Sequence, residues 1–264
     1  MNGELHHLIL LLAYANMTLI NNVIKEPEKY KDQNHYLVKF QSAAKKRILS
    51  FLSSASTEQD TTSWMKCLKE RKCKGVLLIN FNKGNDERIS SGGRRWGIIC
   101  CFENATELWI GNWRVEREPP DTRWEIIYRR IDSNIDTSML NKPINLDELT
   151  KRLDEALKNI SQLAEEIQED YWKNNFFDIG IQILEGTNIK ENQLPNIYSM
   201  KSQRIINAVY SSWVFGGMGS WNDSPPYSAH EKGKEHEFNK YSNTLYETMM
   251  DCIEGAVNSI VSQR

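Results

Sequence analysis

Apolar residues recur at helical spacing through the first third of the chain. The stretch 8–24 keeps apolar side chains at intervals of three and four, which predicts a helix that ends near Lys25. A second periodic stretch, 36–52, predicts another helix, and the segment 63–72 predicts a short helix with one apolar face. The N-terminal region is therefore expected to be predominantly helical.

The pattern changes at Gly75, where short runs rich in β-branched and aromatic residues replace the helical spacing. Four such runs follow closely: GVLLINF, RWGIICCF, TELWIGNWRV and RWEIIYRRI. The segments between them carry Gly, Asn, Asp and Pro and are too short for crossover helices, so neighbouring strands should run antiparallel. We predict a small antiparallel β-meander over about residues 75–132.

Helical spacing returns in the C-terminal half. Asn145 can cap a helix with Glu148 three residues later, and an apolar stripe runs from there toward Phe177. A further helix, 198–215, is expected to end at Gly216 or Gly217, because glycine readily adopts the left-handed conformation found beyond helix ends. A polar segment then leads to a final helix from about Glu235.

Together these elements predict an α+β fold, in which the small β-meander packs against a helical N-terminal region and a helical C-terminal half. The length of 264 residues permits one large unit or two modest ones. We expect a single compact unit over 1–264, with 1–140 and 141–264 as the alternative division.

Charge and cysteine content narrow the classes of function. A formal net charge of -2 argues against direct binding of nucleic acid, which requires a concentration of Lys and Arg. The five cysteines show no Cys-x-x-Cys spacing, so neither a disulfide framework nor a zinc site is indicated, and reduced thiols in a cytoplasm are the simplest interpretation. No stretch is long and apolar enough to span a membrane, and the N-terminus lacks the basic residues of a signal peptide.

Acidic residues concentrate in the helix that begins at Asn145. Such a run is ordinarily a solvated face, but it could also meet a basic partner. The carboxylates that we take as the candidate partner-binding surface are Glu165, Glu166, Glu169 and Asp170.

The segment VFGGMGSWND raises the question of chemistry. It follows a helix and has no Gly-Lys-Ser, which disfavours a phosphate cradle. As a catalytic loop, Asp223 could pair with His230, and the neighbouring His236, Glu235 and Glu237 suggest a metal reading, although their spacing does not place them on one helical face. The segment could also be a structural junction, because its glycines would allow a sharp turn. In this interpretation Asn222 and Asp223 would cap backbone amides. The large apolar side chains that would hold the turn in the core are Trp213, Phe215, Met218 and Trp221. A rigid aromatic loop is also typical of a partner-binding surface.

The passage RIINAVYSSWVFGGMGSWND, followed by YSNTLYETMMDCIEGAVNSI, resembles the C-terminal portion of a group of bacterial proteins of uncharacterised activity, some of them associated with immunity proteins of polymorphic and contact-dependent toxin systems. The resemblance covers about the last quarter of the chain and implies a cytoplasmic protein that binds and blocks a cognate toxin, with no catalysis of its own. The positions that carry it are Trp213, Phe215, Gly216, Gly217, Gly219, Trp221, Asn222 and Asp223. A segment shared across such a group suits a scaffold better than a toxin contact, which directs attention to the acidic helix.

Our functional expectation is a soluble binding protein that neutralises a toxin stoichiometrically, with no cofactor, no metal and no membrane contact. The alternative is a hydrolase or nucleotide-processing enzyme with its site near Asn222, Asp223 and His230. A third hypothesis is a scaffold protein that dimerises through a helix face, which is compatible with the apolar stripe of the helix that begins at Asn145.

Overall fold

The computed structural model describes residues 3–21, 36–42, 57–81, 96–118, 121–131, 143–188, 194–216 and 218–262. The chain divides into two compact units, one formed by Met1–His7 with Pro143–Arg264 and the other by Leu8–Lys142. We call them the helical unit and the sheet unit. Helix α1 (Gly3–Asn21) contributes to both, because the division falls between His7 and Leu8.

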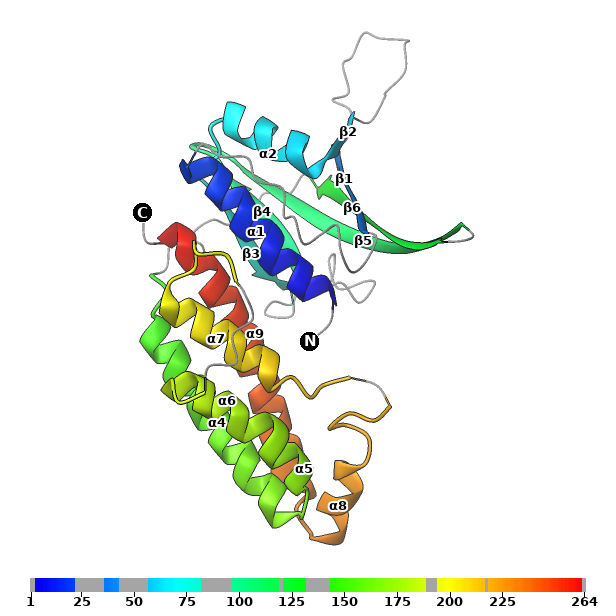
Figure 1. The fold of residues 1–264 in the computed structure, drawn as a ribbon, viewed down its shortest axis with the longest axis vertical. Coiled ribbons are helices and arrows are strands. Elements are labelled where there is room, and N and C mark those ends of the chain that lie inside the picture. The colour runs from blue at the N-terminus through cyan, green and yellow to red at the C-terminus, as the bar shows by residue number, and fades with distance from the viewer. Residues whose placement is uncertain are drawn as a thin grey trace. The chain divides into compact units, whose positions relative to one another are not determined.

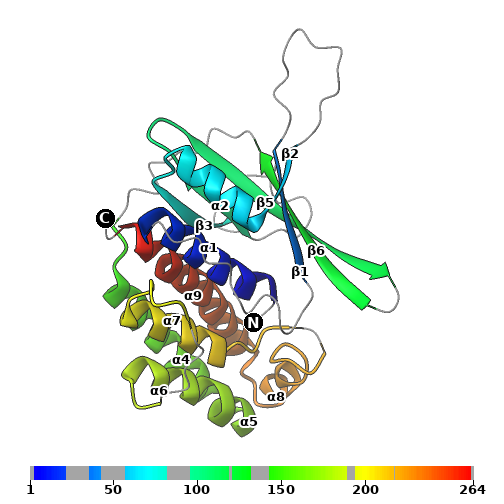
Figure 2. The same ribbon diagram turned by 45° about the horizontal axis from the view of Figure 1, so that its top comes forward.

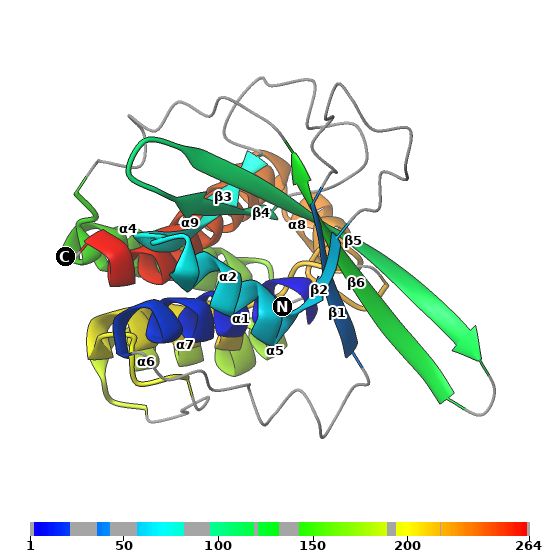
Figure 3. The same cartoon turned by 90° about the horizontal axis from the view of Figure 1, so that it is seen from above.

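A mixed six-stranded sheet with the order β2-β1-β6-β5-β4-β3 forms the framework of the sheet unit. The antiparallel pairing of β3 with β4, β4 with β5 and β5 with β6 confirms the predicted meander. Helices α1 and α2 lie on one face of this sheet (Figures 2 and 3). The elements are β1 (Tyr36–Ser42), β2 (Thr57–Asp60), α2 (Thr61–Glu70), β3 (Gly75–Asn80), β4 (Trp96–Cys101), β5 (Thr106–Glu118) and β6 (Asp121–Ile131).

The prediction of a helix over 36–52 is wrong for its first part. Residues Tyr36–Ser42 form β1, which pairs in parallel with β6 and antiparallel with β2, so the sheet is larger than the expected meander and is mixed. The sequence YLVKFQS alternates with the period of a strand, with Phe40 buried and Leu37 exposed, and the apparent helical spacing arose by reading this run together with the apolar residues after it. Positions 43–52 lie outside the described residues.

An aromatic stack joins β1 to α2 and β6. The ring of Phe40 lies 4.0 Å from that of Trp64 and 5.1 Å from that of Tyr128, in nearly parallel orientations, and all three side chains are buried. On the same unit, the side chain of Asn16 in α1 donates to the carbonyl of Val76 at 2.8 Å and accepts from its amide at 3.0 Å. This pair of hydrogen bonds ties α1 to β3 through the polar backbone of a buried strand.

The helical unit is built around four helices that pack side by side: α4, α6, α7 and α9 (Figure 1). Asn145 caps α4 as predicted, accepting hydrogen bonds from the amides of Asp147 and Glu148. The final helix begins at Glu235, also as predicted. The elements are α4 (Leu146–Glu166), α5 (Asp170–Trp172), the π-helix η4 (Lys173–Phe177), α6 (Asp178–Glu185), α7 (Met200–Ser211), α8 (Pro225–Glu231) and α9 (Glu235–Ser262).

The structure corrects three expectations in this unit. The first helix does not run unbroken to Phe177, because it ends at Glu166 and resumes as the short α5, η4 and α6. The next helix ends at Ser211, before the glycines, where the hydroxyl of Ser212 donates to the carbonyl of Ala208 at 2.6 Å. The segment read as a polar linker contains α8, which starts with two prolines after Ser224, a sequence that suits the first turn of a helix.

Candidate functional site

Helix α4 ends in a tight backbone motif centred on Gln168. The amide of Gln168 donates to the carbonyl of Glu165 at 3.1 Å, and the amide of Glu169 donates to the carbonyl of Ala164 at 2.7 Å. These two bonds define a Schellman motif, which requires the left-handed conformation at the residue beyond the cap. Gln168 adopts it with φ of 62°, although glycine is the residue that suits this region.

Three other helices end with the same motif. Glycine occupies the left-handed position after α6 (Gly186, φ 77°) and after α8 (Gly233, φ 66°), whereas Lys72 occupies it after α2 with φ of 58°. The chain therefore uses glycine at two of these ends and keeps a strained side chain at the other two.

We predict that Gln168→Gly raises the free energy of unfolding by about 1 kcal/mol, because it removes the left-handed strain of a side chain. Lys72→Gly should act in the same direction. The reverse change, Gly233→Gln, meets no atom within 4 Å of the added Cβ, so it tests the conformational strain alone and should cost a similar amount. Urea unfolding followed by circular dichroism measures all three, and a Gln168→Gly variant no more stable than the unsubstituted protein would contradict the prediction.

Two polar contacts fix α8 beside the end of α4. The hydroxyl of Ser228 donates to Glu169 Oε1 at 2.7 Å, and the ammonium of Lys234 lies 2.9 Å from Glu166 Oε2. The hydrogen bond from Lys234 lowers the pKa of Glu166, and a second bond from Gln162 acts in the same direction. The two helix ends are thus joined by charge-assisted bonds.

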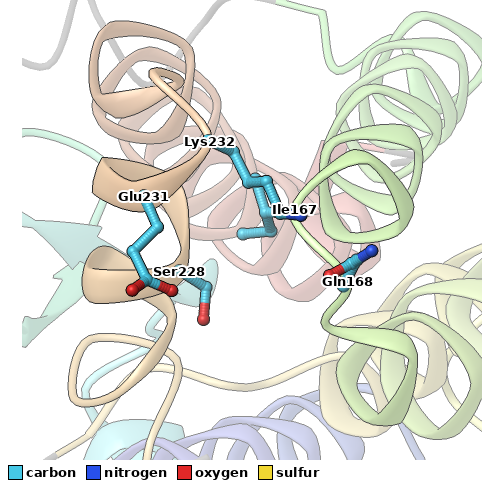
Figure 4. Close-up of a pocket in the computed structure, with 5 residues that line it drawn as sticks. All are labelled: Ile167, Gln168, Ser228, Glu231 and Lys232. Atoms are coloured by element: carbon cyan, nitrogen blue, oxygen red, sulfur yellow. The ribbon is translucent and has the colours of Figure 1, made fainter.

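A shallow depression of about 460 Å³ lies between these helix ends. Ile167 and Gln168 border it from the end of α4, and Ser228, Glu231 and Lys232 border it from α8 (Figure 4). Both helices point their C-termini toward it, and helix C-termini carry partial negative charge. Its surroundings are therefore polar, with an anionic bias.

Two exposed tyrosines lie close in sequence to residues that line the depression. Tyr171 follows the break after α4 with its side chain 62% exposed, and Tyr227 on α8 is 66% exposed. A hydrogen bond to Glu231 raises the pKa of the Tyr227 hydroxyl. We define the α4–α8 surface as these two tyrosines together with their polar neighbours at and after the end of α4 and along α8: Glu165, Gln168, Glu169, Asp170, Tyr171, Tyr227, Ser228, Glu231 and Lys232.

The structure separates the four acidic candidates into two pairs. Glu165 and Asp170 are exposed. Glu166 and Glu169 bind Lys234 and Ser228, so they secure α8 rather than present free carboxylates. Tyr227 was not among the candidates predicted from the sequence because α8 was not predicted, although Pro225 at its first position and Gly233 just past its end are signals of a helix.

The glycine-rich segment is anchored by one tryptophan. Trp221 is fully buried, its ring stacks on Phe238 at 5.2 Å and meets Phe177 edge-on at 5.1 Å, and its indole nitrogen donates to Ser242 at 2.8 Å. Its amide donates to the carbonyl of Val214 at 3.0 Å, which closes the loop. This arrangement agrees with the structural-junction reading for Trp221.

The other residues of this segment differ in burial and in hydrogen bonding. Trp213 and Phe215 are half-buried, and the Trp213 indole donates to the Phe215 carbonyl at 2.8 Å. Met218 is 97% exposed, so it does not pin the turn into the core as expected. Gly219 has φ of 77°, and its amide donates to Asp223 Oδ2 at 2.7 Å. Gly216 accepts at its carbonyl from the Ser220 hydroxyl at 3.1 Å, Asn222 is exposed, and Gly217 lies outside the described residues.

The residues of the catalytic alternative have separate partners. Asp223 binds the amide of Gly219, whereas His230 Nδ1 lies 2.6 Å from Glu235 Oε1, with both of these side chains largely exposed. No hydrogen bond joins Asp223 to His230 or to His236. Across the ranges described above, no group of three or more His, Cys, Asp or Glu side chains could hold a metal ion.

Ionic networks occupy several basic residues of the sheet unit. Glu107 binds Arg71 at 2.6 Å and Arg130 at 2.9 Å, and Arg129 donates to Gln41 at 3.3 Å. Each of these guanidinium groups therefore has an acceptor within the unit. The five cysteines are free thiols.

Comparisons of the chain with protein-family models, with curated proteins and with solved structures found no match. Among the described helices, none has the length and apolar character needed to cross a membrane.

Proposed function

We propose that this protein is a binding protein, an immunity protein that neutralises a cognate bacterial toxin by forming a stoichiometric complex in the cytoplasm. The observation that supports the proposal is the α4–α8 surface, on which exposed carboxylates and two exposed tyrosines accompany helix ends fixed by the Ser228–Glu169 and Lys234–Glu166 contacts. Tyrosine is enriched among the residues that dominate binding energy, and a preorganised surface loses little entropy on association. The resemblance of the last quarter of the chain supports the same class of function.

The charge of this surface indicates the chemistry of the partner. Glu165, Asp170 and Glu231 are exposed, and the C-termini of two helices add partial negative charge beside them. Complementary charge accelerates association and suppresses wrong partners. The toxin surface that docks here is therefore basic, as expected of an enzyme that acts on nucleic acid.

We predict that Glu165→Lys with Asp170→Lys slows association with the captured toxin by about tenfold at low salt and flattens the salt dependence of the rate. These two positions are chosen because neither secures α8, so the fold of the unit is preserved. Glu155→Lys with Glu185→Lys is the matched control, since it makes the same change of charge on exposed positions away from the α4–α8 surface.

The partner is obtained by affinity capture of the tagged full chain from its native cells, with mass spectrometry to identify the bound polypeptide. Recovery of one basic polypeptide at equal stoichiometry supports the proposal. Recovery of the folded protein alone argues against it, and an interface variant that associates as fast as the control removes the α4–α8 surface as the site of contact.

A further inference from the structure

Three aromatic side chains of the helical unit meet at steep angles beside the glycine-rich segment. Trp213 and Phe215 follow the end of α7, and Tyr246 comes from α9. The ring centroids of Trp213 and Phe215 lie 6.2 Å apart with an angle of 87° between the ring planes, and those of Phe215 and Tyr246 lie 5.2 Å apart at 84°. The rings of Trp213 and Tyr246 complete the set at 6.3 Å and 60°. All three side chains are half-buried, so each keeps part of its surface in contact with solvent.

Hydrogen bonds hold the first two rings in place. The indole nitrogen of Trp213 donates to the carbonyl of Phe215 at 2.8 Å, which fixes the indole ring relative to the backbone. Val214, between these two residues, is buried, and its carbonyl accepts from the amide of Trp221 at 3.0 Å. Because Tyr246 lies within the long helix α9, the three rings are positioned before any ligand arrives.

The separations of the rings match the size of one bound cation. Three rings at right angles enclose a corner, like three faces of a cube that share a vertex. A cation that faces all three rings from inside this corner requires centroids separated by about 1.4 times its own distance from each ring. The observed separations of 5.2 to 6.3 Å therefore place a cation about 4 Å from each centroid, within the limit of about 6 Å for a cation–π contact.

The chemistry of the rings selects an ammonium group without N–H bonds. Aromatic faces attract a cation through their negative quadrupole but are poor substitutes for the hydrogen bonds of water. The N–H of Trp213 and the carbonyl of Phe215 are already bonded to each other. The compact ammonium of lysine would lose strong hydration here, whereas a quaternary ammonium has no N–H groups to satisfy. Aromatic cages that bind choline or methylated lysine use the same selection.

We propose that Trp213, Phe215 and Tyr246 form an aromatic cage that binds a quaternary ammonium group. A small solute such as choline and a trimethylated lysine side chain both present this group as a trimethylammonium cation. The cage shares no residue with the α4–α8 surface, so failure of the toxin-binding proposal would leave it intact, and failure of the cage would leave that proposal intact.

The test compares choline with neohexyl alcohol, in which a carbon atom replaces the nitrogen of choline, by isothermal titration calorimetry of the full chain. The two molecules have the same shape, and only choline is charged. We expect choline to bind with a dissociation constant on the order of 1 mM and the neutral molecule to bind at least about tenfold more weakly. Rings that only pack against one another would bind both equally or bind neither, and either result would overturn the proposal.

Leucine variants locate the site, because leucine keeps apolar bulk but has no aromatic face. Phe215→Leu and Tyr246→Leu should each weaken choline binding by roughly three- to tenfold. Tyr241→Leu is the matched control, since it makes the same change at another half-buried position of α9, where Lys240 lies over the ring, and it should bind choline normally. Circular dichroism checks that each variant is folded. Normal choline binding by both cage variants, or an equal loss in Tyr241→Leu, would contradict the assignment.

Two peptides identify the source of the quaternary group. One carries trimethyllysine and the other the same sequence with unmodified lysine. Tighter binding of the trimethylated peptide than of choline indicates a methylated partner protein, and tighter binding of choline indicates a small solute. Equal binding of the two peptides would overturn the selection of a quaternary ammonium.

Discussion

Replacing Trp221 by alanine should lower the free energy of unfolding by about 3–5 kcal/mol, as expected for removal of a large buried aromatic side chain. The indole contacts aromatic rings from three parts of the helical unit: Trp172 of α5, Phe177 of η4 and Phe238 of α9. Its removal leaves a cavity that these rings cannot close, because each is fixed by its own helix. Urea unfolding followed by circular dichroism gives the effect.

Two further variants separate packing from hydrogen bonding at this position. Trp221→Phe keeps an aromatic ring but loses the donor to Ser242, and it should cost roughly 1–3 kcal/mol. Trp213→Ala removes a tryptophan from the same segment, where the side chain is only half-buried, and should cost less than Trp221→Ala. Equal losses for the two alanine variants would show that Trp221 is not the anchor of the segment.

Acidification should destabilise the protein through His7. Burial, together with the charge of the neighbouring His6, lowers the pKa of this histidine from 6.5 to about 3. The unfolded chain therefore binds a proton below pH 6.5 that the folded chain does not bind, so the stability contributed by His7 is complete above that pH and is lost as pH falls toward 3. At one proton the loss is about 1.4 kcal/mol per pH unit, which amounts to about 2 kcal/mol at pH 5.

The measurement is the free energy of unfolding as a function of pH for the unsubstituted protein and for His7→Gln. Glutamine cannot be protonated in this range, and all other titrating groups are common to both chains. The difference between the two curves should therefore be flat above pH 7 and should change steadily below pH 6. Parallel curves throughout would show that His7 does not cause acid destabilisation.

The sequence predicted the α+β fold and most element types because their patterns are local. Capping by Asn145 and the long apolar stripe of α9 depend on neighbours in the chain, and both predictions are confirmed. β1 was mistaken for a helix because its short alternating run was combined with the apolar residues after it, and its parallel pairing with β6 lies many residues further along the chain. No local pattern reports that partner.

The candidate site could be predicted only in part for a similar reason. The carboxylates of Glu165 and Asp170 were identified from charge alone, but charge does not show which acidic residues are engaged by the rest of the fold. Glu166 and Glu169 differ from them because they bind Lys234 and Ser228, which lie just after α8 and within it, in a segment that was predicted to be a polar linker. The break after α4 was hidden as well, since Gln168 does not resemble a helix terminator.

The membership of α1 in both units has a consequence for the order of events during synthesis. Its first residues, including His7, belong with Pro143–Arg264, whereas the rest of the helix belongs with the residues that directly follow it. The hydroxyl of Tyr210 hydrogen-bonds to His6 Nδ1, a contact between residues 204 positions apart. On a ribosome, all residues of the sheet unit emerge early. The helical unit can be completed only after Pro143–Arg264 has emerged and packed against Met1–His7, which was synthesised long before. Its completion therefore depends on closure of a very long loop.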